Sequence, residues 1–242
     1  SFKSGTKVFD WSIPDEWNIY DAYIEHKSGE RFAEFSKNNL HILGYSVPCN
    51  INLPLAELLP HIYTQKNQPD VIPYVTSYYN NIWGFCMSDD DKKSMPDGEY
   101  NVVIDAKRGP GSLEIADLVI EGVSSKEIFF STYVCHPSMA NNELSGPVLS
   151  TALIQYIKLK YKNPKYTYRF VFAPETIGAI AYLSNNIESL QDKVICGFNL
   201  SCVGDERAYS HVESRTGNTL ADSALQSALI GLDNVTTYSF LE

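Results

Sequence analysis

Polar residues that could do chemistry follow three apolar runs in the second half of the chain, at 127–135, 167–173 and 194–200. An imidazole accompanied by several carboxylates can bind a divalent metal ion and supply a general base beside it. Zinc suits such a set because imidazole and carboxylate oxygen are both among its usual ligands. The residues in question are His136, Asn142, Glu143, Glu175, Ser201 and Asp205.

The elements that must position these residues are three strands separated by helices. The apolar runs are short and nearly continuous, which is typical of strands buried on both faces. Between the first two runs, Leu149, Leu153 and Tyr156 recur at helical spacing, and later Thr219 and Asp222 have capping-box spacing before another helix. The pattern predicts an α/β domain with a mostly parallel sheet flanked by helices. Ligands bind such sheets at the carboxyl ends of the strands, where we expect the polar residues to converge.

Each candidate also has an ordinary structural interpretation, and the sequence leaves these alternatives open. His136 could cap a helix or hydrogen-bond within the fold, while Glu143 and Glu175 could be charges near helix N-termini. Asp205 and Glu206 could form a solvated pair in a loop. The functional interpretation gains weight because the candidates fall at equivalent ends of consecutive strands.

A cysteine nucleophile is a further alternative, because Cys135 directly precedes His136. Consecutive residues of a strand point to opposite faces of the sheet, so these two side chains should not pair. We therefore expect no nucleophilic role for this thiol. The five cysteines of the chain are odd in number and lack CxxC spacing, which indicates reduced thiols.

Composition and charge argue against several classes of function. With 19 Lys and Arg against 29 Asp and Glu, the net charge of −10 opposes binding to nucleic acid or to an anionic membrane. No apolar run approaches the ~20 residues that span a bilayer, and the start of the sequence lacks the features of a signal peptide. We expect a cytoplasmic protein.

The first half of the chain has a different character, with short aromatic-rich segments of alternating polarity broken by Pro, Gly and Asn. This pattern indicates an antiparallel, meander-like region. Residues 99–108 and 113–122 alternate with period two on either side of a turn at 109–112. The spacing predicts a β-hairpin there.

Three stretches of the second half resemble the di-zinc aminopeptidase family, which includes bacterial leucyl aminopeptidases and glutaminyl cyclases. These stretches are YVCHPSMANNELSGP (133–147), FVFAPETIGAIAYLS (170–184) and FNLSCVGDERAYS (198–210). The chain is most similar to a subgroup of aminopeptidase-like bacterial proteins, often described only as a domain of unknown function. The resemblance implies a zinc-exopeptidase-like domain over 1–40 and 123–242, truncated at its C-terminus, and an inserted β-rich domain over 41–122.

Matched position by position, the resemblance implies that His136 is the first metal-binding histidine. The family's bridging aspartate falls on Asn142, whose amide cannot bridge two zinc ions, and Glu143 is the available substitute. Of the family's pair of glutamates, the general base falls on Glu175 and is retained, whereas the ligand falls on Thr176.

The third-strand aspartate of the family falls on Ser201, which cannot replace it, and Asp205 lies four residues further along. Neutral side chains at three carboxylate positions remove the charge that holds two cations together, so we do not expect a two-zinc site. We expect about one zinc ion, which a truncated chain would bind less well than the whole protein. Its ligands would be His136, Glu143 and Asp205, with Glu175 as the catalytic base and Asn142 and Ser201 in contact with substrate.

Two functions remain open at this point. The first is an aminopeptidase-like, metal-dependent hydrolase of peptide or amide bonds that acts on a small peptide or aminoacyl-type substrate. In that reading, the acidic pocket pairs with the free amino group of the substrate. The second is a catalytically inactive binding or scaffold protein of the same fold, which the three neutral substitutions favour and the retained His136 and Glu175 oppose.

Overall fold

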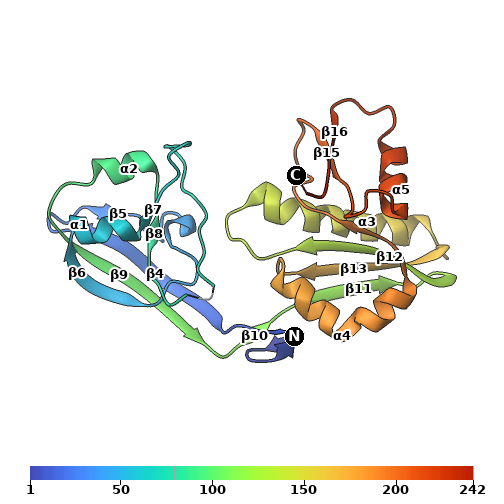
Figure 1. Cartoon of the computed structure of the whole chain (residues 1–242), viewed down its shortest axis with the longest axis horizontal. Coiled ribbons are helices and arrows are strands. Elements are labelled where there is room, and N and C mark those ends of the chain that lie inside the picture. Colours follow the sequence, from blue (N-terminus) through green and yellow to red (C-terminus); the bar gives the residue numbers. More distant parts are fainter. Residues whose placement is uncertain (79, 242) are drawn as a thin grey trace. The chain divides into compact units, whose positions relative to one another are not determined.

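The computed structural model describes residues 1–78 and 80–241. Within them the chain forms two units, and it passes between the units more than once (Figure 1). The first unit comprises Ser1–Phe2, Lys7–Trp11 and Leu113–Glu242, and the second comprises Lys3–Thr6 and Ser12–Ser112.

This division differs from the predicted inserted domain, which was placed at 41–122. Strand β4 (Glu16–His26) pairs along its length with β9 (Glu99–Gly109), so residues that precede position 41 belong to the second unit. The predicted hairpin around 109–112 is wrong. Strand β9 pairs with β4 and β6, whereas β11 (Ala116–Ile120) pairs with β13 in the first unit. Alternating polarity identified both strands but not their partners.

The second unit is built on a four-stranded antiparallel sheet in the order β5-β4-β9-β6. Its core contains Ile24, Tyr100, Val102 and Ile104, all at most 2% exposed, from the buried face of β4 and β9. The remaining elements are short. They are β5 (Arg31–Phe32), η1 (Asn39–His41), β6 (Cys49–Pro54), α1 (Leu55–Leu58), η2 (Leu59–His61), β7 (Ile62–Tyr63), β8 (Phe85–Cys86) and α2 (Asp89–Ser94).

The first unit is built on a mixed four-stranded sheet in the order β11-β13-β12-β14. Strand β12 (Ser124–Tyr133) lies between β13 (Tyr166–Ala173) and β14 (Val194–Asn199) and runs parallel to both. Strand β11 is antiparallel to β13 at one edge. The three apolar runs predicted as strands are thus confirmed, and the parallel pairing brings their carboxyl ends to the same edge of the sheet.

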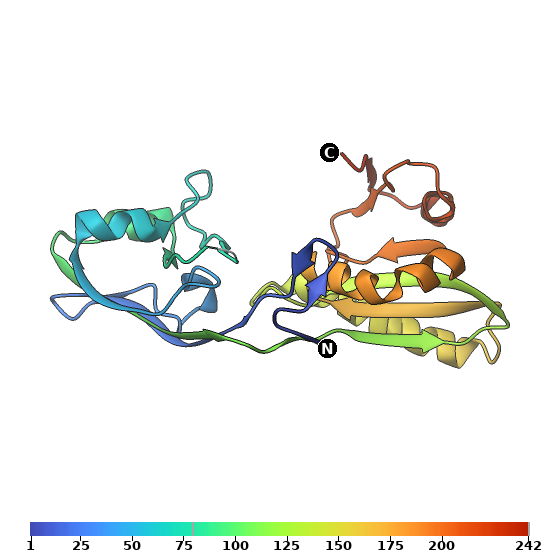
Figure 2. The same cartoon turned by 60° about the horizontal axis from the view of Figure 1, so that its bottom comes forward.

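Helices α3 (Ser145–Lys160) and α4 (Ile177–Lys193) lie against opposite faces of this sheet (Figures 1 and 2). Helix α3 approaches the sheet closely at Gly146, where an added Cβ would lie 2.2 Å from Thr132 Oγ1. On the other face, the ring of Tyr182 in α4 lies 6.4 Å from the ring of Phe129. Both helices therefore begin close to the carboxyl ends of the parallel strands.

An ionic network of one buried and one exposed carboxylate fixes α4 to the sheet. The Arg169 guanidinium donates to both carboxylate oxygens of Glu127, at 2.6 and 3.0 Å, and Glu127 is only 3% exposed. The Tyr182 hydroxyl donates to Asp117 Oδ2 at 2.8 Å, and Arg169 Nη1 lies 3.3 Å from the same oxygen. Because these side chains come from β11, β12, β13 and α4, the network ties all four elements together.

The C-terminal part of the first unit contains β15 (Tyr209–Val212), α5 (Leu220–Leu229) and β16 (Val235–Tyr238), with β15 and β16 parallel. Helix α5 begins with the predicted capping box, since Thr219 and Asp222 each accept from the other's backbone N–H. The remaining short elements are β1 (Phe2–Lys3), β2 (Lys7–Val8), β3 (Trp11–Ser12), β10 (Ser112–Leu113) and the π-helical turn η3 (Ala140–Leu144).

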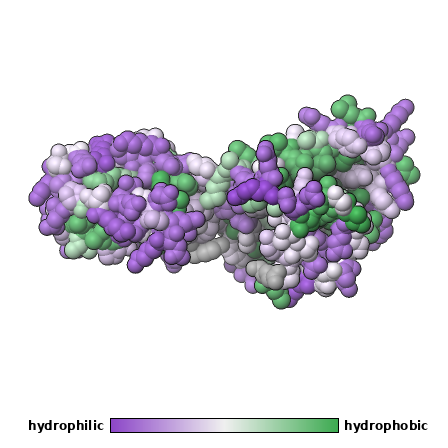
Figure 3. Space-filling view, turned by 90° about the horizontal axis from the view of Figure 1, so that it is seen from above, coloured by the Kyte–Doolittle hydropathy of each residue, from purple (hydrophilic) through white to green (hydrophobic). Residues whose placement is uncertain are grey.

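Large apolar side chains are exposed on the outer side of α3, among them Val148, Tyr156 and Leu159. Figure 3 shows hydrophobic surface over the part of the chain that follows Leu113. None of the helices in the described ranges combines the length and the apolar content needed to cross a membrane.

Candidate metal and catalytic site

Three loops meet at the carboxyl ends of the parallel strands. The loop after β12 carries His136, the loop after β13 carries Glu175, and the loop after β14 carries Ser201. Backbone hydrogen bonds hold the first residues of the loops together: Val134 N–H donates to the Ala173 carbonyl at 3.1 Å, and Leu200 N–H donates to that of Ser131 at 2.8 Å. The loops that follow the three parallel strands therefore meet at one edge of the sheet.

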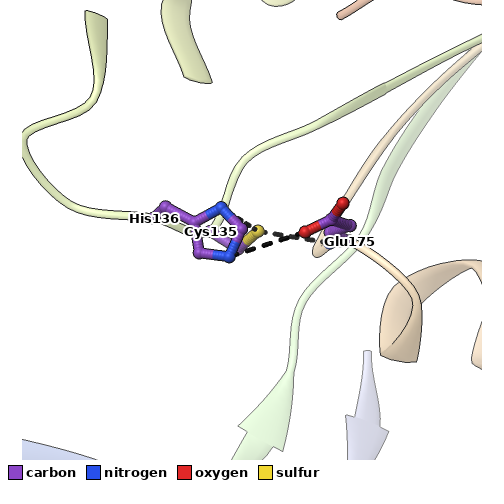
Figure 4. A group of neighbouring side chains, drawn as sticks. All are labelled: Cys135, His136 and Glu175. Atoms are coloured by element: carbon purple, nitrogen blue, oxygen red, sulfur yellow. Dashed lines mark hydrogen bonds and ion pairs between the residues drawn. The ribbon is translucent and has the colours of Figure 1, made fainter. Parts of the chain in front are cut away.

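The centre of the site is a group of three side chains, Cys135, His136 and Glu175 (Figure 4). One potential ligand atom from each lies within 4.8 Å of the others. His136 Nε2 is 3.6 Å from Glu175 Oε2, and the backbone N–H of Glu175 donates to Cys135 Sγ at 3.3 Å. Imidazole nitrogen, thiolate sulfur and carboxylate oxygen are all donor types that zinc accepts.

Glu143 is hydrogen-bonded to two residues of this group, Cys135 and His136. Its carboxylate is 5% exposed, and it accepts from the Cys135 N–H at 2.5 Å and from His136 Nδ1 at 2.7 Å. An ionised carboxylate can only accept, so this contact places the imidazole proton on Nδ1 and directs the Nε2 lone pair toward Glu175. The structure brings Glu143 to His136, but onto Nδ1 rather than onto Nε2, the nitrogen that faces Glu175.

Asn142 and Ser201 also lie at the site and are linked through Tyr133. The Asn142 amide donates to the Tyr133 hydroxyl at 3.0 Å, and that hydroxyl is hydrogen-bonded to Ser201 Oγ. The other end of the amide, Asn142 Oδ1, lies 3.4 Å from His136 Nδ1. Burial raises the pKa of Tyr133, which keeps its hydroxyl protonated and able to donate. These neutral groups form a hydrogen-bonded chain that reaches His136.

Asp205 does not join the group. Its carboxylate is bound by the guanidinium and the backbone N–H of Arg207, two residues further along the same loop. Hydrogen bonds from Arg207 lower the pKa of Asp205 to about 2. In the parts of the chain that the structure describes, the set of side chains that could share one cation does not include Asp205. The prediction that it is a ligand is corrected on this point.

The position of Cys135 beside His136 was missed because strand alternation was applied beyond the end of the strand. Strand β12 ends at Tyr133, so Cys135 and His136 lie in a loop, and Cys135 Sγ is 3.7 Å from His136 Nδ1. Burial of the sulfur, together with the neighbouring carboxylates, raises the pKa of Cys135 to about 11. A thiol with a raised pKa carries little thiolate at neutral pH. The useful signal was a Cys-His pair immediately after a buried strand.

Each of the three loops contains one non-glycine residue with positive φ. These residues are Ser138 at 62°, Thr176 at 55° and Cys202 at 52°. Thr176 has ψ of −66°, and Ile177 N–H donates to the Glu175 carbonyl at 2.5 Å, which is a γ-turn. Backbone in these regions costs about 1–3 kcal/mol per residue and is concentrated at functional sites.

Two pockets open beside the group. One, of about 590 Å³, is formed by the loop that carries Cys135, His136 and Glu143. The other, of about 310 Å³, lies between the sheet and α4 next to Glu175. Its apolar lining comes from Phe129, Val171, Ala173, Ala179, Tyr182 and Leu183, and its polar lining from Ser131, Tyr133, Glu175, Thr176 and Asn199.

Comparison with known proteins gives close relatives. The family model described as a domain of unknown function, DUF4910, matches residues 1–242. A protein of Clostridium acetobutylicum is 43% identical over 229 residues, which are 94% of this chain and 52% of that protein. Its provisional name is polysaccharide biosynthesis protein with aminopeptidase-like domain. A crystal structure of a provisionally named peptidase from the same species has a TM-score of 0.92 at 40% identity, and covers 99% of this chain and 56% of that one. The chain thus spans about half the length of these relatives.

More distant solved structures share the fold. A zinc aminopeptidase from Bacillus subtilis has a TM-score of 0.61 at 14% identity, and covers 98% of this chain and 68% of that one. A peptidase M28 precursor from Shewanella amazonensis SB2B has a TM-score of 0.63 at 12% identity, and covers 93% of this chain and 68% of that one. The chain therefore has a mixed α/β fold of the zinc aminopeptidase type.

Proposed function

The chain belongs to the DUF4910 family, and from this premise and the geometry of the site we propose that it is an aminopeptidase-like, metal-dependent hydrolase of peptide or amide bonds. The observation that carries the proposal is the meeting of His136 and Glu175, 3.6 Å apart, from the two neighbouring loops that follow β12 and β13. The names of its relatives, an aminopeptidase-like protein and a peptidase, agree with it.

The donor set fits one zinc ion. A tetrahedral zinc ion with its usual bond lengths holds two ligand atoms about 3.4–3.6 Å apart. The potential ligand atoms of the group lie within 4.8 Å of one another. Side-chain movements that shorten these separations by about 1 Å would let the atoms bind one zinc ion. His136 is the principal ligand in this proposal, and Glu143 fixes its ring through Nδ1, as carboxylates commonly do behind a metal-binding histidine. When bound, the ion would polarise the scissile carbonyl and acidify water.

Glu175 is the proposed base. Its side chain is 49% exposed, and it faces His136 across 3.6 Å, so it borders both His136 and the solvent. From this position its carboxylate can take a proton from the attacking water and return it to the departing amine. The γ-turn at Thr176 holds the backbone of Glu175 in place while the side chain remains accessible.

The proposed substrate is a small peptide or aminoacyl compound with a free amino group. Asn142 and Ser201 are the proposed polar contacts, because Asn142 lies beside His136 and Ser201 is linked to Asn142 through the Tyr133 hydroxyl. The net charge of −10 favours a cationic amine over an anionic ligand. Since the name of one relative refers to polysaccharide biosynthesis, N-acylated amino sugars belong in the substrate panel beside peptides.

A second candidate function is a binding protein that has lost catalysis. The neutral network of Asn142, Tyr133 and Ser201 and the pairing of Asp205 with Arg207 favour it, because both withhold acidic groups from the site. The two functions make different predictions for Glu175.

The test is hydrolysis of aminoacyl anilides, dipeptides and N-acyl amino sugars by the zinc-loaded chain. Glu175→Gln should lower the rate at least ~100-fold. The matched control, Glu188→Gln on the exposed side of α4, should retain the wild-type rate. Equal rates for Glu175→Gln and wild type would reject the mechanism, and no hydrolysis by any form would favour the binding protein.

A further inference from the structure

We propose that Cys135 is a metal ligand at this site, so that the cation is held by a thiolate together with His136. The inference rests on the proposed function only in that both need a cation beside His136. Three independent features of the loop carry it: the position of the sulfur, the groups that hold it there, and the chemistry of the donors.

The position of the sulfur suits a shared cation. Cys135 Sγ lies within 4.8 Å of a ligand atom of His136 and of Glu175, and Figure 4 shows the sulfur and the carboxylate on the same side of the imidazole. A tetrahedral zinc ion would set a sulfur and a nitrogen ligand about 3.6 Å apart. A rotation of the Cys135 side chain that moves the sulfur by about 1 Å would bring sulfur and nitrogen to that separation.

The surrounding groups hold the two residues as a unit. One carboxylate, Glu143, accepts both the backbone N–H of Cys135 and the Nδ1–H of His136. On the other side, the backbone N–H of Glu175 donates to Cys135 Sγ at 3.3 Å. A backbone donor aimed at a sulfur stabilises negative charge there, as in metal-bound thiolates. The cysteine is thus oriented by the same residues that orient the histidine.

The chemistry of the pair specifies the class of cation. Sulfur and imidazole nitrogen are ligands of zinc and related thiophilic divalent ions, and they are poor ligands for magnesium and calcium. On binding, the thiol proton passes to solvent and the sulfur lone pair forms the bond to the cation. The facing carboxylate of Glu175 adds a further negative charge beside the ion.

A first experiment uses the wild-type chain and its own internal control. Cys135 and Cys202 are both exposed, and both lie in loops at this edge of the sheet, but only Cys135 belongs to the ligand group. The chain is alkylated with and without zinc, and each cysteine is followed by mass spectrometry. Zinc should slow the alkylation of Cys135 at least tenfold, because a coordinated thiolate is a poorer nucleophile than a free one. The alkylation rate of Cys202 should stay nearly unchanged. Equal protection of both cysteines, or of neither, overturns the proposal.

A second experiment distinguishes coordination from steric shielding. Cobalt(II) bound to a thiolate gives an intense near-ultraviolet charge-transfer band, which oxygen and nitrogen ligands do not give. The band should appear in the wild type and in Cys202→Ser and be absent from Cys135→Ser. Circular dichroism melting of each variant checks that it is folded, and Cys135→Ala serves as a second variant without a hydroxyl.

The outcomes separate this inference from the proposed function. A cobalt-loaded chain that hydrolyses amides without a thiolate band refutes the role of Cys135 and leaves the hydrolase intact. A chain that shows the band but hydrolyses none of the panel supports the thiolate ligand and refutes the hydrolase. A band that persists in Cys135→Ser overturns the assignment to this sulfur.

Discussion

Replacing Glu143 by glutamine tests how the site is held together. The change keeps the shape of the side chain and removes its charge. The structure shows two donors directed at this carboxylate, the Cys135 N–H at 2.5 Å and His136 Nδ1 at 2.7 Å, with only 5% of the residue exposed. Glutamine has one acceptor oxygen, so one of the two donors must face an NH2 group and lose its partner.

The magnitude follows from the buried donor that is left over. A buried polar group without a partner costs about 1–3 kcal/mol. The cost falls on the zinc-bound state, because a ring bound through Nε2 keeps its proton on Nδ1, whereas the free ring can move it to Nε2. Since 1.4 kcal/mol is a factor of ten, the affinity of Glu143→Gln for zinc should fall about 10- to 100-fold. The same range is found when groups behind a metal-binding histidine are removed.

Competition with a chromogenic chelator measures this loss for Glu143→Gln, wild type and the surface control Glu188→Gln. An affinity within about twofold of wild type would refute the orienting role of Glu143. A loss beyond about a thousandfold would instead identify Glu143 as a direct ligand, as the sequence had predicted.

Three further predictions concern the scaffold that positions the site. Gly146→Ala should cost about 1–3 kcal/mol in the free energy of unfolding measured with urea, because its Cβ would lie 2.2 Å from Thr132 Oγ1. The control Gly197→Ala meets nothing closer than 3.7 Å and should cost less, so equal losses would contradict the argument. Glu127→Gln should cost about 3 kcal/mol, since it leaves the part-buried guanidinium at β13 without its bidentate partner, and a loss below ~1 kcal/mol would contradict this. Hydrogen bonds from Ser214 and Thr219 lower the pKa of Asp222, so its contribution to stability should be present above about pH 4 and be lost as the pH falls below that value. An unchanged acid dependence in Asp222→Asn would reject this last prediction.

The sequence was a good guide to the elements of the first unit. Continuous apolar runs became β12, β13 and β14, and the spacing of Thr219 and Asp222 became a capping box. These features are local, because a strand buried on both faces and a helix cap each leave a signal within a few residues. Partner choice between strands is not local, which is why β9 and β11 were wrongly paired as a hairpin.

The sequence predicted which loops of the site meet, because the order and direction of the strands determine this. Parallel strands place their following loops together, so His136, Glu143 and Glu175 could be expected to meet. The details depended on backbone geometry that residue types do not reveal. Strand β12 ends two residues before Cys135, which frees its side chain to turn toward His136, and the carboxylate of Asp205 is taken up within its own loop.

Anomalous diffraction from zinc-soaked crystals, recorded at the zinc absorption edge, tests the central claim most directly. We expect a single peak at the carboxyl ends of β12 and β13, about 2.0–2.3 Å from His136 Nε2 and Cys135 Sγ. A peak beside other residues, or no peak at that position with the ion in excess, would contradict it.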